Sequence, residues 1–393
     1  MKDVFLVSAA RTAIGSFGGA LKDQKPGELA AHVAKAALER GGVDPTLVGH
    51  SFVGSVVATE PRDAYVARIA SMGAGIPKES PALSVNRLCG SGLQAIISAS
   101  QAIILGDCEI ALGAGVEIMS GAPYFATGQR WGQKMGDAAL LDGLTGALSD
   151  PFGRMHMGVT AENVAARYTI TREDQDALAL ESQHRAAAAI DQGYFRDQIV
   201  PVEIMVKRKP VAFEVDEYVR RDAVAEDFTK LKPVFLKENG TVTAGNASGI
   251  NDGAAAAILA SEDAVKANGL KPLARLVSWG FAGVDPAYMG IGPVPATRQA
   301  LARAGLTIAD LDVIEANEAF AAQACAVTRE LGFDPAKVNP NGSGISLGHP
   351  IGATGAIITT KLVHELQRTG GRYGLVTMCI GGGQGIAAIW ERV

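Results

Sequence analysis

Apolar positions in the first and last thirds of the chain alternate between two patterns. Short continuous apolar runs, typical of buried strands, are followed by longer Ala-rich segments in which apolar residues recur at helical spacing. This alternation predicts an α/β fold in which helices lie between layers of sheet. The predicted strands are Val4–Ser8, Ile110–Gly113, Val313–Ala316 and Leu375–Cys379, and the predicted helices are Gly27–Gly41, Gly92–Leu105, Pro295–Ala304 and Thr354–Leu366.

The two outer thirds also resemble each other. Residues 37–43 match residues 300–306, and residues 89–92 fall on residues 351–354 at nearly the same offset. The pattern predicts a duplicated α/β unit with a pseudo-twofold axis. Chance similarity between Ala-rich helices is the alternative interpretation.

The middle of the chain has a different texture. Gly121–Gly146 is rich in glycine and irregular, Thr171–Ala189 is predicted to be an amphipathic helix, and Ile199–Lys237 is dense in charge. We therefore expect a loop domain inserted between the two halves, where it can shape a binding site. The predicted boundaries are an N-terminal half at 1–120, completed by about 250–271, a loop domain at 121–249 and a C-terminal half at 272–393.

Composition excludes several classes of protein. Hydrophobic residues make up 48% of the chain and charged residues 20%, which is typical of an ordered globular protein. The net charge of −5 argues against nucleic-acid binding. We expect no membrane span, which needs an apolar run of roughly 18 residues, and no targeting signal at either end. The four cysteines show no CxxC spacing, so we expect no disulfide framework, no metal and a reducing, cytoplasmic location.

Cys89 lies in a turn with the pattern of a nucleophile. The segment 83–93 runs from extended chain through a glycine-flanked cysteine into a helix that is apolar on nearly every face. A buried helix places its positive N-terminal end beside the thiol, where it favours the thiolate. Small neighbours would let a substrate carbonyl approach the backbone N–H groups. From the motif alone, a nucleophile and a small core residue remain equal alternatives.

Cys379 ends a predicted strand and precedes a run of glycines at 381–383. Bare N–H groups after Gly381 would suit an oxyanion hole, and a thiol there could move a proton. A tight glycine turn without catalytic function is the alternative. Cys108 and Cys325 are predicted to be core residues.

His349 lies in the glycine-rich loop 341–355, where few side chains are available to pack against it. A neutral imidazole there could activate a thiol or donate to a developing oxyanion. Asn317 follows the strand Val313–Ala316, at the end of a sheet where ligands bind in α/β folds. It could orient a water or cap a helix that begins at Ala319 and Phe320.

Four motifs in this order resemble the thiolases, the family of acetyl-CoA acetyltransferases and β-ketothiolases. They are NRLCGSG around Cys89, NEAFA from Asn317, GHPIGATG around His349 and CIGGGQG from Cys379. The resemblance extends over essentially the whole chain. It implies the thiolase fold, with two pseudo-symmetric α/β halves in a layered αβαβα arrangement plus an inserted loop domain.

The resemblance also implies roles for these residues. Cys89 would be the acylated nucleophile, and Cys379 would be the general acid and base. His349 would activate Cys89 and, with a water held by Asn317, stabilise the enolate oxygen. The N–H groups of Cys89 and Gly381 would form a second oxyanion hole. This chemistry requires no metal and no permanently bound cofactor, since coenzyme A enters as a substrate.

Coenzyme A would lie along the loop domain. One position departs from the biosynthetic pattern, because Asp227 stands where a serine is expected near the adenine. His156 and Met157 resemble the short-chain branch of the family, most similar to bacterial broad-specificity β-ketothiolases of polyhydroxyalkanoate synthesis. The implied contacts of coenzyme A and substrate are Leu148, His156, Met157, Gln183, Arg220, Phe235, Ala244, Ser248, Met289, Ala319 and Phe320.

The expected activity is reversible condensation of two acetyl-CoA, or of acetyl-CoA with a short acyl-CoA such as propionyl-CoA, through an acyl-cysteine in a ping-pong mechanism. The resemblance implies a homotetramer, a dimer of dimers, with its contact in Gly121–Gly146. Acyl-CoA substrates are the only partners expected, with no nucleic acid and no membrane. The alternatives are a degradative thiolase for longer chains, an acyl-CoA carrier without turnover and a cysteine hydrolase.

Overall fold

The computed structural model describes residues 2–393, and its central feature is a ten-stranded sheet. One half of the sheet has the strand order β4-β3-β5-β10-β1, and the other has the order β11-β14-β13-β12. The halves meet where β1 pairs with β11 at Phe5 and Leu6. The strands are β1 (Val4–Arg11), β3 (His50–Gly54), β4 (Ala82–Val85), β5 (Ile110–Ile118), β10 (Asn251–Ser261), β11 (Ala274–Gly283), β12 (Val313–Ala316), β13 (Tyr373–Ile380) and β14 (Gln384–Arg392), and β2 (Gly15–Ser16) pairs with β10.

The two halves repeat one topology, as the internal similarity of the sequence predicts. In each half an outer helix leads to a strand, β3 or β12, that runs parallel to its inner neighbour, β5 or β13. The first half has one further parallel strand, β4, at its edge, and the remaining neighbours pair antiparallel. The outer helices α1 and α9 end on Gly42 and Gly305, which adopt the left-handed backbone conformation that favours glycine. The repeated helices are α1 (Pro26–Gly41) and α3 (Ser91–Leu105) in the first half and α9 (Pro293–Ala304) and α12 (Thr354–Thr369) in the second.

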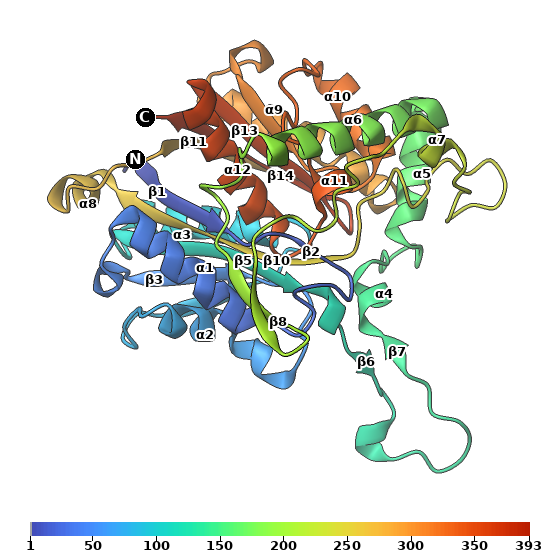
Figure 1. Ribbon diagram of the computed structural model, residues 1–393, viewed down its shortest axis with the longest axis horizontal. Coiled ribbons are helices and arrows are strands. Elements are labelled where there is room, and N and C mark those ends of the chain that lie inside the picture. Colours follow the sequence, from blue (N-terminus) through green and yellow to red (C-terminus); the bar gives the residue numbers. More distant parts are fainter. Residues whose placement is uncertain (1) are drawn as a thin grey trace.

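Helices and strands are stacked in layers (Figure 1). Apolar cores lie between these layers. The central core contains the facing helices α3 and α12 with strands of both halves. A second core lies between α1, α2 (Val66–Gly73) and the first half of the sheet, and a third lies between α9, α10 (Ala321–Leu331) and the second half. The layers are therefore helix, sheet, helix, sheet, helix. Every strand and helix predicted in the outer thirds is present, and most are longer than predicted.

Helix α3 corrects one expectation from the sequence. Leu88–Leu105 is long and apolar enough, with a mean hydropathy of 1.5, to match a membrane span by composition. The stretch is 67% buried inside the fold, because α3 is packed between the sheet and α12. Its hydrophobicity is that of a core helix with neighbours on both sides.

The inserted segment forms a small region beside the two halves. Residues 121–146, which we call the arm, project from the body as a long hairpin closed by β6 (Tyr124–Phe125) and β7 (Leu141–Asp142) (Figure 1). The other elements of the segment are α4 (Gly143–Ala147), α5 (Met157–Tyr168), α6 (Arg172–Asp191), the hairpin β8 (Val202–Val206) and β9 (Lys209–Phe213), and α7 (Ala225–Thr229); α8 (Glu262–Ala267) and α11 (Gly344–Leu347) belong to the flanking halves.

Helix α6 is present where predicted but is not amphipathic. Its buried face combines alanines with polar side chains, among them Gln175, Asp176, Ser182 and Gln183. Asp176 accepts hydrogen bonds from Arg172 and Asn246, and Ser182 donates to Glu318. The helix therefore packs through a polar network, which a hydrophobic pattern cannot reveal.

A buried ion pair joins the inserted segment to β1. Arg11 and Asp216 form two hydrogen bonds, of 2.8 and 3.0 Å, and both side chains are fully buried. Asp216→Ala would leave the Arg11 charge buried without a partner, so we expect the free energy of unfolding to fall by about 3–5 kcal/mol. Urea denaturation followed by circular dichroism measures the change. Lys266→Ala, which breaks an exposed pair with Glu262, is the matched control and should lower the free energy of unfolding far less. Equal losses would contradict the prediction.

Candidate active site

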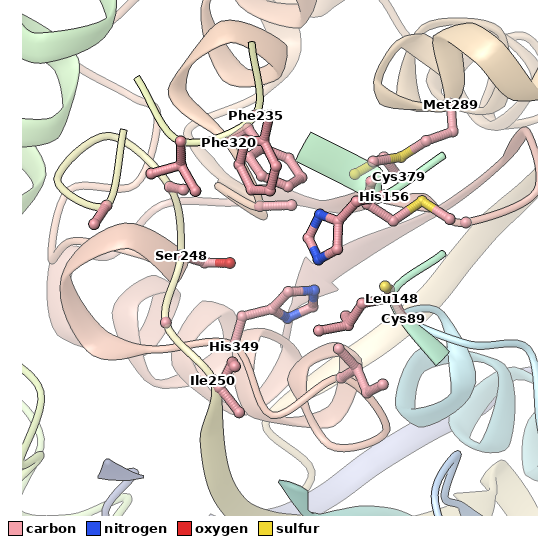
Figure 2. Close-up of a pocket in the computed structure, with 18 of the residues that line it drawn as sticks. Cys89, Leu148, His156, Phe235, Ser248, Ile250, Met289, Phe320, His349 and Cys379 are labelled. Atoms are coloured by element: carbon pink, nitrogen blue, oxygen red, sulfur yellow. The ribbon is translucent and has the colours of Figure 1, made fainter. Parts of the chain in front are cut away.

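The predicted catalytic motifs meet around one cavity of about 350 Å³ (Figure 2). Figure 2 shows the rings of His156 and His349 between Ser248 on one side and Cys89 on the other. The lining residues predicted from the sequence are Cys89, Leu148, His156, Met157, Phe235, Ala244, Ser248, Met289, Ala319, Phe320, His349, Cys379 and Gly381.

Cys89 lies in a tight turn between β4 and α3. The preceding residue, Leu88, has a φ of +47°, a conformation that is strained for leucine. Hydrogen bonds hold it there: the Asn86 side chain accepts from the Leu88 N–H, and the Ser91 hydroxyl accepts from Arg87 and donates to Leu88. The turn therefore fixes the direction of the Cys89 side chain.

The N–H groups near the helix start lower the pKa of the Cys89 thiol, as expected, but they do not make it a thiolate in the free protein. Burial raises the pKa of the Cys89 thiol to about 11. The backbone N–H groups of Gly381 and of Cys89 itself face the sulfur and lower the pKa, but they do not offset the burial. Cys89 is consequently a thiol that needs a base to become a nucleophile.

His349 is a base that stays neutral. It is 5% exposed, and burial lowers the pKa of its imidazole to about 4. Its backbone N–H donates to the side chain of Asn251, and its Nδ1 lies 2.7 Å from the Thr354 hydroxyl. Further along the loop, the N–H of Gly352 donates to the buried carboxyl group of Glu117. These contacts tie the loop to β10, α12 and β5.

Cys379 is the second thiol of the cavity. It is 1% exposed near the end of β13, and the hairpin to β14 passes through the three glycines at 381–383. Burial, together with the nearby Cys89 sulfur when that is charged, raises the pKa of the Cys379 thiol well above its usual range. Gly382 and Gly383 both have φ near +80°, a backbone conformation that favours glycine for steric reasons, and this explains the glycines in the hairpin.

Asn317 does not cap a helix. The following helix, α10, begins at Ala321, and Phe320 occupies the capping position. Asn317 is buried behind the cavity and does not line it. Its Nδ2 lies 3.4 Å from Nε2 and 3.5 Å from Nδ1 of His349, and its Oδ1 accepts no hydrogen bond from the described residues.

The opposite wall of the cavity is apolar and aromatic. His156 stacks on Phe235 with 4.8 Å between ring centroids, and Phe235 meets Phe320 edge to face at 6.4 Å. Met157 and Met289 belong to the same apolar cluster, which also contains Cys379. Flexible methionines and flat rings suit a ligand with a long, narrow apolar stem.

Two predicted contacts lie elsewhere. Gln183 is buried, accepts a hydrogen bond from the Arg220 N–H and does not line the cavity; the side chain of Arg220 is exposed. The exposed Asp227 caps the start of α7 by accepting from the Val224 N–H, which accounts for a carboxylate at this position.

The lining residues that sequence reasoning missed are Met119, Val234, Thr243, Ala247, Gly249, Ile250 and Ile351. Several of them adjoin predicted residues, which was the only available signal.

The other two cysteines differ from each other. Cys108 is 9% exposed and belongs to the central core, as predicted. Cys325 packs against the apolar cluster that contains Cys379, but it is only partly buried and also lines a second cavity, so the prediction of a core residue is confirmed only in part.

Comparison with known proteins places this site in a family. The sequence model of the thiolase N-terminal domain matches residues 4–263, and that of the thiolase C-terminal domain matches residues 270–392. Together they span nearly the whole chain. The chain belongs to the thiolase family.

Individual relatives narrow the similarity further. The chain is 64% identical to beta-ketothiolase BktB of Cupriavidus necator over 392 residues, which cover 100% of both chains. The crystal structure of human mitochondrial 3-ketoacyl-CoA thiolase in complex with CoA has a TM-score of 0.97 and 49% identity, covering 100% of this chain and 98% of that one. Acetyl-CoA acetyltransferase of Bacillus anthracis has a TM-score of 0.97 and 48% identity, covering 100% and 99%.

Proposed function

We propose that the protein is a β-ketothiolase, an acyltransferase that converts acetyl-CoA and a short acyl-CoA reversibly into a 3-ketoacyl-CoA and free CoA. The observation that carries this proposal is the convergence of two thiols, Cys89 and Cys379, and a neutral imidazole, His349, on one cavity. A Claisen condensation needs a nucleophile that holds one acyl group and a base that deprotonates the other. These three side chains supply both.

The first half-reaction acylates Cys89. His349 takes the thiol proton as the sulfur attacks the thioester carbonyl carbon, and CoA leaves as a thiolate that receives this proton from His349. The N–H groups of Cys89 and Gly381, which already face the sulfur, would stabilise the oxyanion. The products are an acyl-cysteine, free CoA and a neutral imidazole.

The second half-reaction forms the carbon–carbon bond. The Cys379 proton moves to His349, and the resulting thiolate takes a proton from the methyl group of acetyl-CoA. The imidazolium, with a water held by Asn317, would stabilise the enolate oxygen. The carbanion then attacks the acyl carbonyl and expels the Cys89 thiolate, which recovers its proton from His349. Each half-reaction releases one product, which is a ping-pong mechanism.

The pKa of His349 gives the acylation step a characteristic pH dependence. Because burial lowers this pKa to about 4, the imidazole remains a base in mildly acidic solution. We expect the rate of acyl-enzyme formation from acetyl-CoA, measured by quenched flow and intact mass, to change little between about pH 8 and about pH 5.5. A histidine with the usual pKa of about 6.5 would make it roughly tenfold slower at the lower pH, and that result would contradict the prediction.

The apolar wall is the proposed site of the pantetheine arm of coenzyme A. Nδ1 of His156 accepts a hydrogen bond from the Gly158 N–H at 3.0 Å. The neutral ring therefore carries its proton on Nε2, which makes His156 a donor for an amide or thioester oxygen. We propose as further contacts of the pantetheine arm Leu148, Met157, Phe235, Ala244, Ser248, Met289, Ala319 and Phe320. Gln183 and Arg220 do not line this cavity, so any contact with coenzyme A would lie outside it.

Short acyl groups are the proposed substrates. The Cys89 side chain packs against an apolar cluster that includes Val57, Met119, Leu144 and Ile351, so an acyl group on the sulfur meets walls nearby. The test is thiolysis of acetoacetyl-CoA, 3-ketovaleryl-CoA and a long-chain 3-ketoacyl-CoA, each with free CoA, followed by loss of the enolate absorbance. We expect fast turnover of the first two and little of the third.

The other outcomes distinguish the alternatives. Activity that rises with chain length would indicate a degradative thiolase. Binding without turnover would indicate an acyl-CoA carrier, and release of a free acid would indicate a hydrolase. Any of the three would overturn the proposal.

The arm is the proposed contact of a homotetramer. Trp131 is 90% exposed and Met135 is 92% exposed on this projecting hairpin (Figure 1). Large apolar side chains exposed together usually mark an interface. Light scattering on the purified protein tests the proposal, and the mass of a single chain would contradict it. Because catalysis through two thiols requires a reducing compartment, we propose the cytoplasm as its location.

A further inference from the structure

Thr354, the first residue of α12, lies against Nδ1 of the His349 ring. Its Oγ1 is 2.7 Å from Nδ1 of His349 and 2.9 Å from the carbonyl oxygen of Pro350. Thr354 is 2% exposed, so its hydroxyl is shielded from bulk solvent. Thr354 is not part of the mechanism described above.

We propose that Thr354 is a positioning residue that fixes the tautomer of His349. A hydroxyl group has one hydrogen to donate, and the Pro350 carbonyl can only accept. When the hydroxyl donates to Pro350, its oxygen is free to accept the hydrogen of Nδ1. Both hydrogen bonds form together only if the neutral ring carries its proton on Nδ1. Nε2 then has a free lone pair.

The opposite tautomer loses one of these bonds. With the proton on Nε2, the hydroxyl would have to turn to Nδ1 and leave the Pro350 carbonyl. The Pro350 carbonyl keeps the hydrogen bonds that it accepts from the N–H groups of Ala353 and Thr354. Loss of the third bond therefore corresponds to a preference of about threefold to tenfold. Asn317 does not distinguish the two tautomers, because its Nδ2 lies 3.4 Å from Nε2 and 3.5 Å from Nδ1.

This assignment matters for the proposed function, on which it rests. Acylation requires Nε2 to receive the Cys89 proton, and only the Nδ1–H tautomer can receive it there. In a Ser-His-Asp triad a carboxylate holds the tautomer and also stabilises the imidazolium. A neutral hydroxyl can hold the tautomer but does not stabilise the imidazolium. Among the described residues no carboxylate forms a hydrogen bond with the His349 ring. Thr354 therefore orients the base without increasing its basicity.

The experiment compares three variants by the single-turnover rate of Cys89 acylation. Thr354→Val keeps the shape and removes the hydroxyl, so we expect acylation to slow about threefold to tenfold, with little change in the affinity for acetyl-CoA. Thr354→Ser restores the hydroxyl and should return the rate to near wild type. Thr360→Val is the control, because Thr360 is equally buried on the same helix and donates only to the Ala356 carbonyl; its rate should stay near wild type.

A second measurement reads the tautomer directly. The ¹⁵N spectrum of the histidine-labelled protein, with His349 assigned by loss of its signals in His349→Asn, should show a protonated Nδ1 and an unprotonated Nε2. Thr354→Val should shift both signals toward each other as the tautomers mix. A protonated Nε2 in the wild type, or unchanged signals in Thr354→Val, would overturn the inference. If the wild type forms no acyl-enzyme, the proposed function fails, whereas the spectrum still tests the tautomer.

Discussion

Cys89→Ala is expected to abolish both turnover and acyl-enzyme formation. The fold holds this one sulfur at the strained turn before α3, where the N–H groups of Cys89 and Gly381 face it. Without this sulfur the acyl group has no attachment point. The first half-reaction is then abolished, not merely slowed. We expect thiolysis to fall by at least about 10⁴-fold. Intact mass after incubation with acetyl-CoA should show no added acetyl group.

The other cysteines provide matched controls. Cys108→Ala and Cys325→Ala also remove one thiol each, but from the central core and from the second cavity. Both variants should keep turnover and acylation near wild type when folded, which circular dichroism checks. Acetylation of Cys89→Ala, or loss of acylation in a folded Cys325→Ala, would contradict the assignment of the nucleophile.

Most of the fold follows from local pattern. Buried strands such as β12 are short apolar runs. The helices α1 and α9 end at glycines that adopt the left-handed backbone conformation, which few other residues tolerate. The junction between β1 and β11 consists of only two paired positions, and the hydrophobic pattern of the sequence does not predict this pairing. The polar face of α6 is likewise invisible, because its partners Asn246 and Glu318 come from distant parts of the chain.

The site divides in the same way. Residues in motifs, such as Cys89 and His349, could be predicted because their chemistry needs particular side chains and glycine neighbours. Met119 and Ile351 could not, since an apolar residue lines a cavity only through its place in the fold. The ionisation state of Cys89 could not be predicted for a related reason. The sequence shows the helix end beside the thiol, but the burial that raises the pKa of the thiol depends on the complete structure.

The two thiols depend on each other electrostatically. A charge on Cys89 is one cause of the raised pKa of Cys379, so both sulfurs resist ionising together. Cys89 is an uncharged thiol in the free protein, so this repulsion acts only while its sulfur is a thiolate, during attack or departure. In the acylated protein Cys89 is a neutral thioester, and burial is then the main cause of the raised pKa of Cys379.

Cys379→Ala should separate the half-reactions. The variant keeps Cys89, His349 and the N–H groups around the sulfur, so we expect acetyl-CoA to acylate it, and intact mass should show one added acetyl group that persists. Condensation should fall by about 10⁴-fold, the upper end of the range for one acid or base, because no other thiol in the cavity can deprotonate the methyl group. A variant that condenses acetyl-CoA at more than about one hundredth of the wild-type rate would show that Cys379 is not the base, and a variant that cannot be acylated would show that the two thiols do not act in separate steps.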